Sequence, residues 1–114
     1  MEFYIDGKKH ELNVLRTCYL KDNSLAIIID ENGKPLTITI NLSTMIASNN
    51  VAFLNTKDFP WAEKFIEENG LGKKVGLSLE DNDYIYPLYE FNIEKITVSQ
   101  EEEYKPTYLA KEEL

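Results

Sequence analysis

Cysteine and histidine are almost absent from this chain of 114 residues, which has one of each, Cys18 and His10. A single cysteine excludes a disulfide within the chain, so we expect a location in the reducing cytoplasm. If both residues lie on one strand, their separation along it is about 26 Å. They can then neither share a zinc ion nor act as a nucleophile and its base. We expect Cys18 to be buried, His10 to be exposed, and no metal ion or cofactor to be required.

Long apolar runs are also missing. The longest extends from Leu25 to Ile29, far short of the roughly 20 residues that a membrane span needs. The first residues have neither a basic start nor a small-residue cleavage site, so they do not predict a signal peptide. Gly70 and Gly72 follow the helix that we expect from Asp58 to Asn69, whereas the glycines of a phosphate-binding loop precede a helix. We therefore expect a soluble protein without a membrane partner.

Basic residues are scarce, with 12 Lys and Arg against 20 Asp and Glu, and the net charge is −8. The excess is uneven: residues 1–60 carry seven acids and six bases, whereas residues 61–114 carry thirteen acids and six bases. A nucleic-acid binder needs a basic stripe, so direct binding to nucleic acid is not expected. The acidic second half either keeps the protein soluble or faces a partner protein with a basic surface.

Turn-forming residues divide the chain into short strands. Asp6-Gly7 and Asn32-Gly33 are two-residue hairpin turns, because both central positions of such turns need positive φ. Leu36 to Leu42 alternates apolar and polar residues, which is typical of a strand with one buried face. The predicted fold is α+β, with a curved antiparallel sheet of about five to seven strands. We expect a single domain over residues 1–99 and an acidic polar tail over residues 100–114.

One convincing helix is predicted, from Asp58 to Asn69. Asp58 can cap its start, and Gly70 is placed to end it. Its apolar side chains recur at steps of three and four residues, which predicts that it packs on one face of the sheet. These side chains are Phe59, Ala62, Phe65 and Ile66.

Catalytic groups are not expected. The carboxylates lie on predicted exterior positions, without an apolar pocket that could raise a pKa. The turn Glu80-Asp81-Asn82-Asp83 lacks the spaced ligands and the distal glutamate of a calcium loop. The sequence therefore predicts a binding protein rather than an enzyme.

A long strand, Tyr84 to Ile93, supplies the candidate contact face. Ile85, Tyr89, Phe91 and Ile93 share one side, which we assign to the core. Pro87 cannot donate a ladder hydrogen bond, so the strand lies at an edge or bulges there. Tyrosine is frequent at binding hot spots, and acids beside it can steer a basic partner. The predicted contact residues are Glu80, Asp81, Asp83, Tyr84, Tyr86, Glu90 and Glu94. The alternative is a solvated strand face whose tyrosines pack under the tail.

Three segments carry a resemblance to a known family: Val51–Thr56, Trp61–Leu71 and Tyr86–Phe91, the last reading Tyr-Pro-Leu-Tyr-Glu-Phe. Together they resemble an uncharacterised bacterial domain family whose members are cargo of conjugative elements, plasmids and prophages. The resemblance covers most of the chain. It departs from the family pattern at Asp81–Tyr84, where a small Ser-Gly pair is usual. The family has no established activity, so the resemblance implies a genetic context and no mechanism.

Three functions remain under consideration. The first is an inhibitor of a host nucleic-acid-handling defence protein, of the anti-CRISPR or anti-restriction type, whose negative face occupies a groove built for phosphates. The second is a structural or regulatory protein-interaction module without charge mimicry. The third is a small-ligand binder, which needs a deep apolar pocket with convergent polar groups.

Overall fold

The computed structural model describes residues 1–19, 22–42 and 50–99. The predicted acidic tail lies outside the described residues. The elements, in chain order, are β1 (Glu2–Ile5), β2 (Lys8–Glu11), β3 (Asn13–Cys18), β4 (Leu25–Glu31), β5 (Lys34–Thr37), β6 (Thr39–Ile40), β7 (Val51–Leu54), α1 (Ala62–Glu68), β8 (Gly72–Asp81), β9 (Tyr84–Phe91), the 3₁₀ turn η1 (Ile93–Lys95) and β10 (Thr97–Val98).

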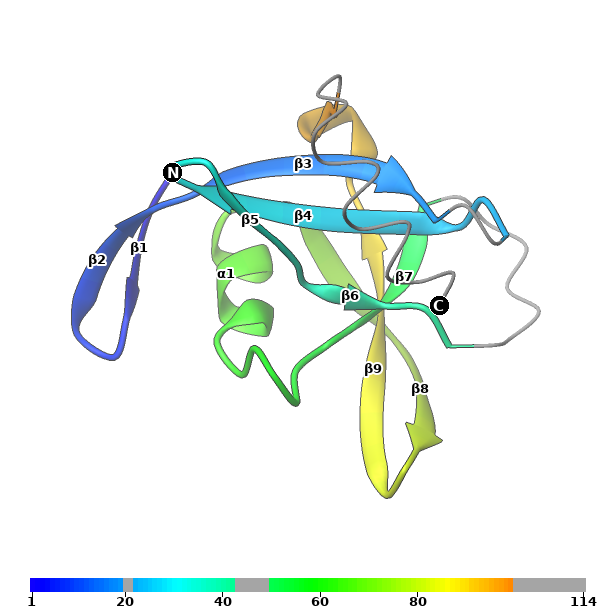
Figure 1. Cartoon of the computed structure of the whole chain (residues 1–114). Coiled ribbons are helices and arrows are strands. Elements are labelled where there is room, and N and C mark those ends of the chain that lie inside the picture. The colour runs from blue at the N-terminus through cyan, green and yellow to red at the C-terminus, as the bar shows by residue number, and fades with distance from the viewer. Residues whose placement is uncertain (20–21, 43–49, 100–114) are drawn as a thin grey trace.

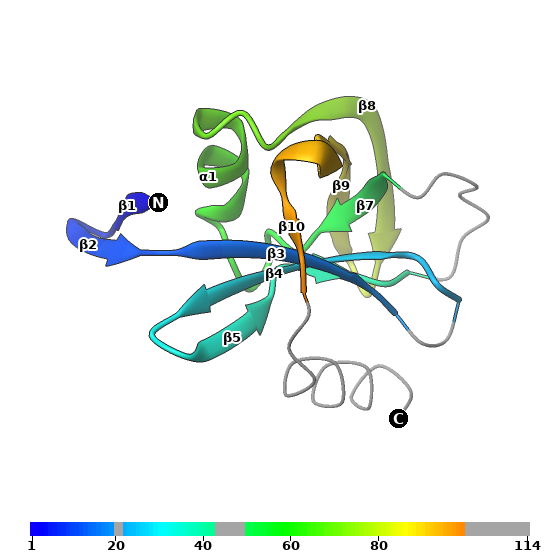
Figure 2. The same cartoon turned by 90° about the horizontal axis from the view of Figure 1, so that it is seen from above.

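The described strands form three sheets. Strands β1 and β2 make a two-stranded sheet, and the other two are four-stranded, with the orders β10-β3-β4-β5 and β6-β7-β9-β8. All pairs are antiparallel except β10 with β3. Figure 2 shows α1 and the sheet of β7, β8 and β9 on one side of the β3–β4 ribbon. The predicted α+β class is confirmed, but ten strands in three sheets replace the expected single sheet of five to seven.

The segment from Lys9 to Leu20 could be taken for one strand from its sequence, but the structure divides it at Leu12. Residues 8–11 pair with β1, whereas residues 13–18 pair with β4 in another sheet. Leu12 is buried between them, and its N–H donates to the carbonyl of Met1 at 2.8 Å. Strand β3 then pairs with β4 in an unbroken register from Asn13 to Cys18, so this strand has no bulge. Its buried residues Val14 and Thr17 lie on opposite faces.

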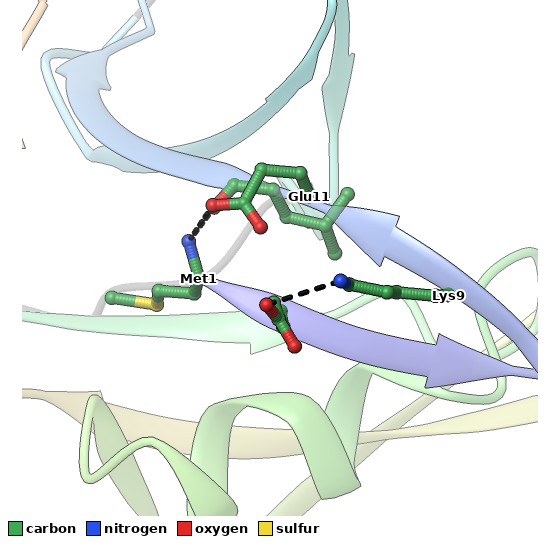
Figure 3. Close-up of polar contacts among 5 residues, drawn as sticks. Met1, Lys9 and Glu11 are labelled. Carbon is green, nitrogen blue, oxygen red and sulfur yellow. Dashed lines mark hydrogen bonds and ion pairs between the residues drawn. The ribbon is translucent and has the colours of Figure 1, made fainter.

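The N-terminal hairpin has the turn that its sequence predicts. Asp6 and Gly7 have φ values of 52° and 80°, which are the positive angles of a two-residue hairpin turn. Its exposed ion pairs join the Met1 amino group to Glu11 at 3.1 Å and Lys9 to Glu2 at 3.2 Å (Figure 3). Pairs this exposed contribute about 0–1 kcal/mol each, so they set little of the stability.

The main core lies between the two four-stranded sheets and α1. Strand β4 is central, because Leu25, Ile27 and Ile29 point into this core while Ala26 and Ile28 are buried on its other side. Strand β4 is therefore covered on both faces. The buried members of the main core are Phe3, Leu12, Val14, Leu25, Ile27, Ile29, Ile38, Ala52, Leu54, Ala62, Phe65, Ile66, Leu71, Tyr89, Phe91 and Ile96.

Helix α1 begins four residues later than predicted, at Ala62. Asp58 does not cap it; instead, its backbone N–H and one carboxylate oxygen bond the Asn55 side chain at 3.2 and 3.1 Å. Trp61 stands at the N-cap without a side-chain hydrogen bond to the helix. The Asn55–Asp58 pair closes a separate turn, and this turn replaces the first helical turn that the sequence suggested. No helix in the described part of the chain is long and apolar enough to cross a membrane.

The end of α1 matches its prediction. Gly70 has a φ of 64°, and its N–H donates to the Glu67 carbonyl at 3.2 Å. The N–H of Leu71 donates to the Ile66 carbonyl at 2.9 Å. These two bonds define a Schellman motif, in which glycine adopts the left-handed conformation without a steric cost. Leu71 is buried and returns the chain to the core.

The β8–β9 hairpin contains the bulge expected near Pro87, although the bulge lies in the partner strand. Strand β9 is not an edge, because it pairs with both β7 and β8. The register shifts between Lys74, opposite Tyr89, and Ser78, opposite Pro87. Gly76, with a φ of 80°, lies in this bulge. Two extra residues on β8 therefore bend the hairpin beside the proline.

Candidate binding surface

Three of the predicted contact residues gather at the tip of the β8–β9 hairpin. Glu80 lies opposite Ile85, Asp81 lies opposite Tyr84, and Asp83 is in the turn between the strands. All three carboxylates are exposed, and within the described residues none of them forms an ion pair. Figure 1 shows this hairpin projecting beyond the rest of the described chain. The tip therefore presents a concentrated negative charge to solvent.

Glu90 and Glu94 lie away from the tip. Glu90 is opposite Lys73, and its carboxylate is 3.8 Å from the lysine Nζ. Six residues of extended strand separate it from Tyr84, a distance of about 20 Å. Glu94 lies farther along, in η1. The seven predicted residues therefore do not form one contact face.

The exposure predicted for Tyr86 is wrong, because its side chain is 5% exposed. It packs with Phe53, Leu42 and Leu88 in a second buried cluster on the β9 face that we had assigned to solvent. Tyr84 is half-buried against the same cluster, with its ring 4.8 Å from that of Tyr86. The reason is that Leu42 and Phe53 pack against this face of β9, so apolar side chains cover both faces of the strand.

Ile85 is exposed although it was predicted to be buried, the opposite of Tyr86. We had assigned it to the core, yet it is 61% exposed. Tyr89 and Phe91, on the same side of β9, are buried in the main core. The tip of the hairpin extends past the elements that cover those two residues, so an apolar side chain at Ile85 reaches solvent. Ile85 is thus more available for contact than either tyrosine.

An exposed apolar patch lies beside the acidic tip. Leu77, at 66% exposure, and Ile85 line a hollow of about 400 Å³, and Val75 is exposed nearby. The rim of the hollow includes Glu63 and Lys74. Apolar surface surrounded by polar groups is typical of protein interfaces. Sequence reasoning missed Leu77, and the neighbouring Gly76 was the signal that could have indicated a bulge there.

The base of the hairpin is fixed to α1 by a polar cluster. The Tyr89 hydroxyl donates to Glu63 Oε2 at 2.8 Å and also contacts Glu67 Oε2, while Lys74 Nζ lies 2.9 Å from Glu63 Oε2. Burial, and then the hydrogen bonds to Glu67 and Glu63, raise the pKa of Tyr89 far above its ordinary value. The hydrogen bond to Glu63 and its negative charge raise the pKa of Lys74. These contacts orient the hairpin on the body of the protein.

The free energy of unfolding is expected to fall less between pH 8 and pH 11 in Tyr89→Phe than in the wild type. An unfolded phenol ionises near pH 10, whereas folded Tyr89 keeps its proton, so its contribution to stability is present below pH 10 and lost as the pH rises. One unit above pH 10 this loss is about 1.4 kcal/mol. Urea unfolding at pH 8 and pH 11 measures it. An equal loss in the wild type and in Tyr89→Phe would contradict the role of Tyr89.

The histidine and the cysteine lie apart. His10 on β2 is half-buried rather than exposed, and its Nδ1 is 2.8 Å from Glu31 Oε2. Cys18, at the end of β3, is exposed, so its predicted burial is wrong. Thr17 and Tyr19, on either side of it, take the buried positions. Within the described ranges there is no group of three or more His, Cys, Asp or Glu side chains that could hold a metal ion.

The described hollows are open rather than deep. Three of them have volumes of about 410, 480 and 400 Å³ and open to solvent. The second is lined in part by Asp30 and Ser99, whose buried Oδ1 and Oγ atoms have no hydrogen-bond partner among the described residues. Water can satisfy such atoms in a polar hollow of this size. These three hollows therefore lack the enclosed shape of a typical small-ligand site.

Comparison with known proteins gives one family. Residues 12–110 match the family described as Domain of unknown function (DUF4313). No curated protein and no solved structure matches the chain. The matched range includes α1 and the whole β8–β9 hairpin with its acidic tip. The chain therefore belongs to the DUF4313 family, an uncharacterised domain family.

Proposed function

We propose that this chain is a non-enzymatic binding protein that docks a basic partner protein through its β8–β9 hairpin. The observation that carries the proposal is the projecting tip (Figure 1), where Glu80, Asp81 and Asp83 are exposed and form no ion pair with the residues that the structure describes. Such carboxylates create a local negative potential that accelerates association with a basic surface. Leu77 and Ile85 beside the tip offer apolar area, which supplies most of the affinity in protein interfaces.

The partner class that we propose is a nucleic-acid-handling defence protein of the host, and the chain acts as its inhibitor in the anti-CRISPR or anti-restriction manner. A groove that holds a phosphate backbone is lined with Lys and Arg. A narrow hairpin with three carboxylates at its end has a suitable charge and shape to occupy such a groove. The resemblance to cargo of mobile elements supports this choice of partner, because such elements encounter host defences.

The alternative is an interaction module that does not mimic nucleic acid. It is favoured by the exposed apolar side chains of Leu77 and Ile85, which line one hollow and could bind a partner with little help from charge. The two proposals differ in which force dominates. Charge attraction between exposed groups is screened by salt, whereas apolar contact is not.

Salt and a nucleic-acid competitor separate the two proposals. For a partner captured from a host lysate at about 0.05 M NaCl, inhibition by charge mimicry predicts at least about tenfold weaker binding at 0.5 M NaCl. It also predicts that a short duplex DNA displaces the chain, because both occupy the same groove. Binding that survives both treatments would favour the module without mimicry. Surface plasmon resonance on the captured pair measures both effects.

A further inference from the structure

Strand β8 is a long, uncovered edge of its sheet. It has ten residues, and within the described chain no other strand pairs with its outer side. None of its residues is classed as buried, and Leu77 is the most exposed large apolar side chain of the described residues. An uncovered edge presents free backbone N–H and C=O groups that another strand can join. The question is which strand fits this edge.

The sequence of β8 is complementary to itself in the antiparallel direction. It reads Lys73-Lys74 at one end, Glu80-Asp81 at the other and mainly apolar residues between them. If Leu77 lies on a two-fold axis, Lys73 faces Asp81 of the second copy and Lys74 faces Glu80 of the second copy. Symmetry repeats both pairs, so all eight charged side chains meet an opposite charge. We propose that β8 joins β8 of a second copy of this chain, forming a symmetric dimer centred on Leu77.

The faces of the strand agree with this pairing. Lys73 lies opposite Glu90 and Asp81 opposite Tyr84, so both point to the same side of the sheet. Lys74 and Glu80, which lie opposite Tyr89 and Ile85, both point to the other side. The two ends of β8 keep the same alternation relative to β9, because the bulge between Lys74 and Ser78 adds two residues rather than one. Paired residues of neighbouring strands point to the same side, so each lysine can reach the acid that it faces.

The charge pattern also selects a second copy over other edges. Edge strands commonly carry lysines that repel any approaching strand. On β8 the lysines occupy only one end, so a parallel copy places like charges together and an antiparallel copy does not. The lysines now contact Glu90 and Glu63, but their side chains are 77% and 58% exposed and can turn to new partners. One pair of strands buries a small area, so we expect a weak dimer that dissociates on dilution.

This inference does not rest on the proposed function, although both use Glu80 and Asp81. A dimer joined along β8 covers these carboxylates with the lysines of the second copy. Self-association and binding of a basic partner are then mutually exclusive, and the dimer is a masked form of the binding surface. The dimer can be tested on the purified chain alone, so its failure leaves the proposed partner binding intact.

Sedimentation equilibrium of charge-reversal variants tests the dimer. We expect the wild type to dimerise reversibly, and K73E/K74E and E80K/D81K each to raise the dimer dissociation constant at least about tenfold, through like-charge repulsion. An equimolar mixture of the two variants should recover the wild-type dissociation constant, because each then faces opposite charges. The variant with all four reversals should also dimerise like the wild type.

A second variant tests the centre of the interface rather than its charged ends. Leu77→Asp places a carboxylate on the two-fold axis of the dimer, so it should abolish dimerisation. Because Leu77 is exposed, the circular dichroism spectrum should not change. The proposal is overturned by a wild type that stays monomeric at about 0.5 mM, a concentration sufficient for a weak interface. It is equally overturned by double variants that dimerise like the wild type, or by a mixture that fails to recombine.

Discussion

Replacing Phe65 with alanine is expected to lower the free energy of unfolding by about 3–5 kcal/mol. Phe65 is fully buried on α1, with its ring 5.1 Å from that of Phe3 and 6.1 Å from that of Trp61. It thus joins the helix to the N-terminal hairpin. Small domains have total stabilities of about 5–15 kcal/mol, so the loss is a large part of the whole. Urea unfolding followed by tryptophan fluorescence measures it.

Tyr4→Ala is the matched control for Phe65→Ala. Tyr4 is an aromatic residue of the same hairpin, but its side chain is 62% exposed. Its removal should change the free energy of unfolding by no more than about 0.5 kcal/mol. Similar losses in the two variants, or a loss below 1 kcal/mol in Phe65→Ala, would contradict the assignment of the core around α1.

Reversing the three acids of the hairpin tip is expected to abolish binding to the partner. E80K/D81K/D83K turns a negative tip into a positive one, and truncating or opposing a desolvated charge pair at an interface costs about 2–5 kcal/mol. We therefore expect binding to weaken at least about a hundredfold. The three side chains are exposed and form no ion pairs within the described chain, so the melting temperature should change little.

The control for the tip variant carries the same charge change on another hairpin. E2K/D6K/E11K reverses three exposed acids of the β1–β2 hairpin, two of which belong to weak surface ion pairs. It should bind the partner nearly as well as the wild type. Equal losses in both triple variants would show that net charge alone, rather than the β8–β9 tip, determines binding.

Local signals in the sequence predicted the turns and the helix end correctly. Asp6-Gly7 and Asn32-Gly33 have the positive φ angles that a two-residue turn needs. Gly70 ends α1 by the expected Schellman bonds. In each case the outcome depends on the conformational preferences of adjacent residues. The start of α1 was missed because the Asn55 side chain, rather than the helix, bonds Asp58.

The side-chain directions on β9 could not be predicted, because they depend on distant segments. Tyr86 is buried by Phe53 and Leu42, which are far away in the sequence. Ile85 is exposed because the tip extends beyond its covering elements. Alternation shows which residues share a face but not which face is covered, and an inner strand can have both faces covered. For this reason the burial of Tyr86 and the exposure of Ile85 could not be predicted.

The most direct test of the account is quantitative affinity capture from a host lysate with three baits. The baits are the wild type, E80K/D81K/D83K and the control E2K/D6K/E11K, each first shown to be folded. We predict one or more basic nucleic-acid-handling proteins that the wild type and the control retain, that the tip variant loses and that duplex DNA displaces. Identical sets of proteins on all three baits would contradict binding through the β8–β9 hairpin.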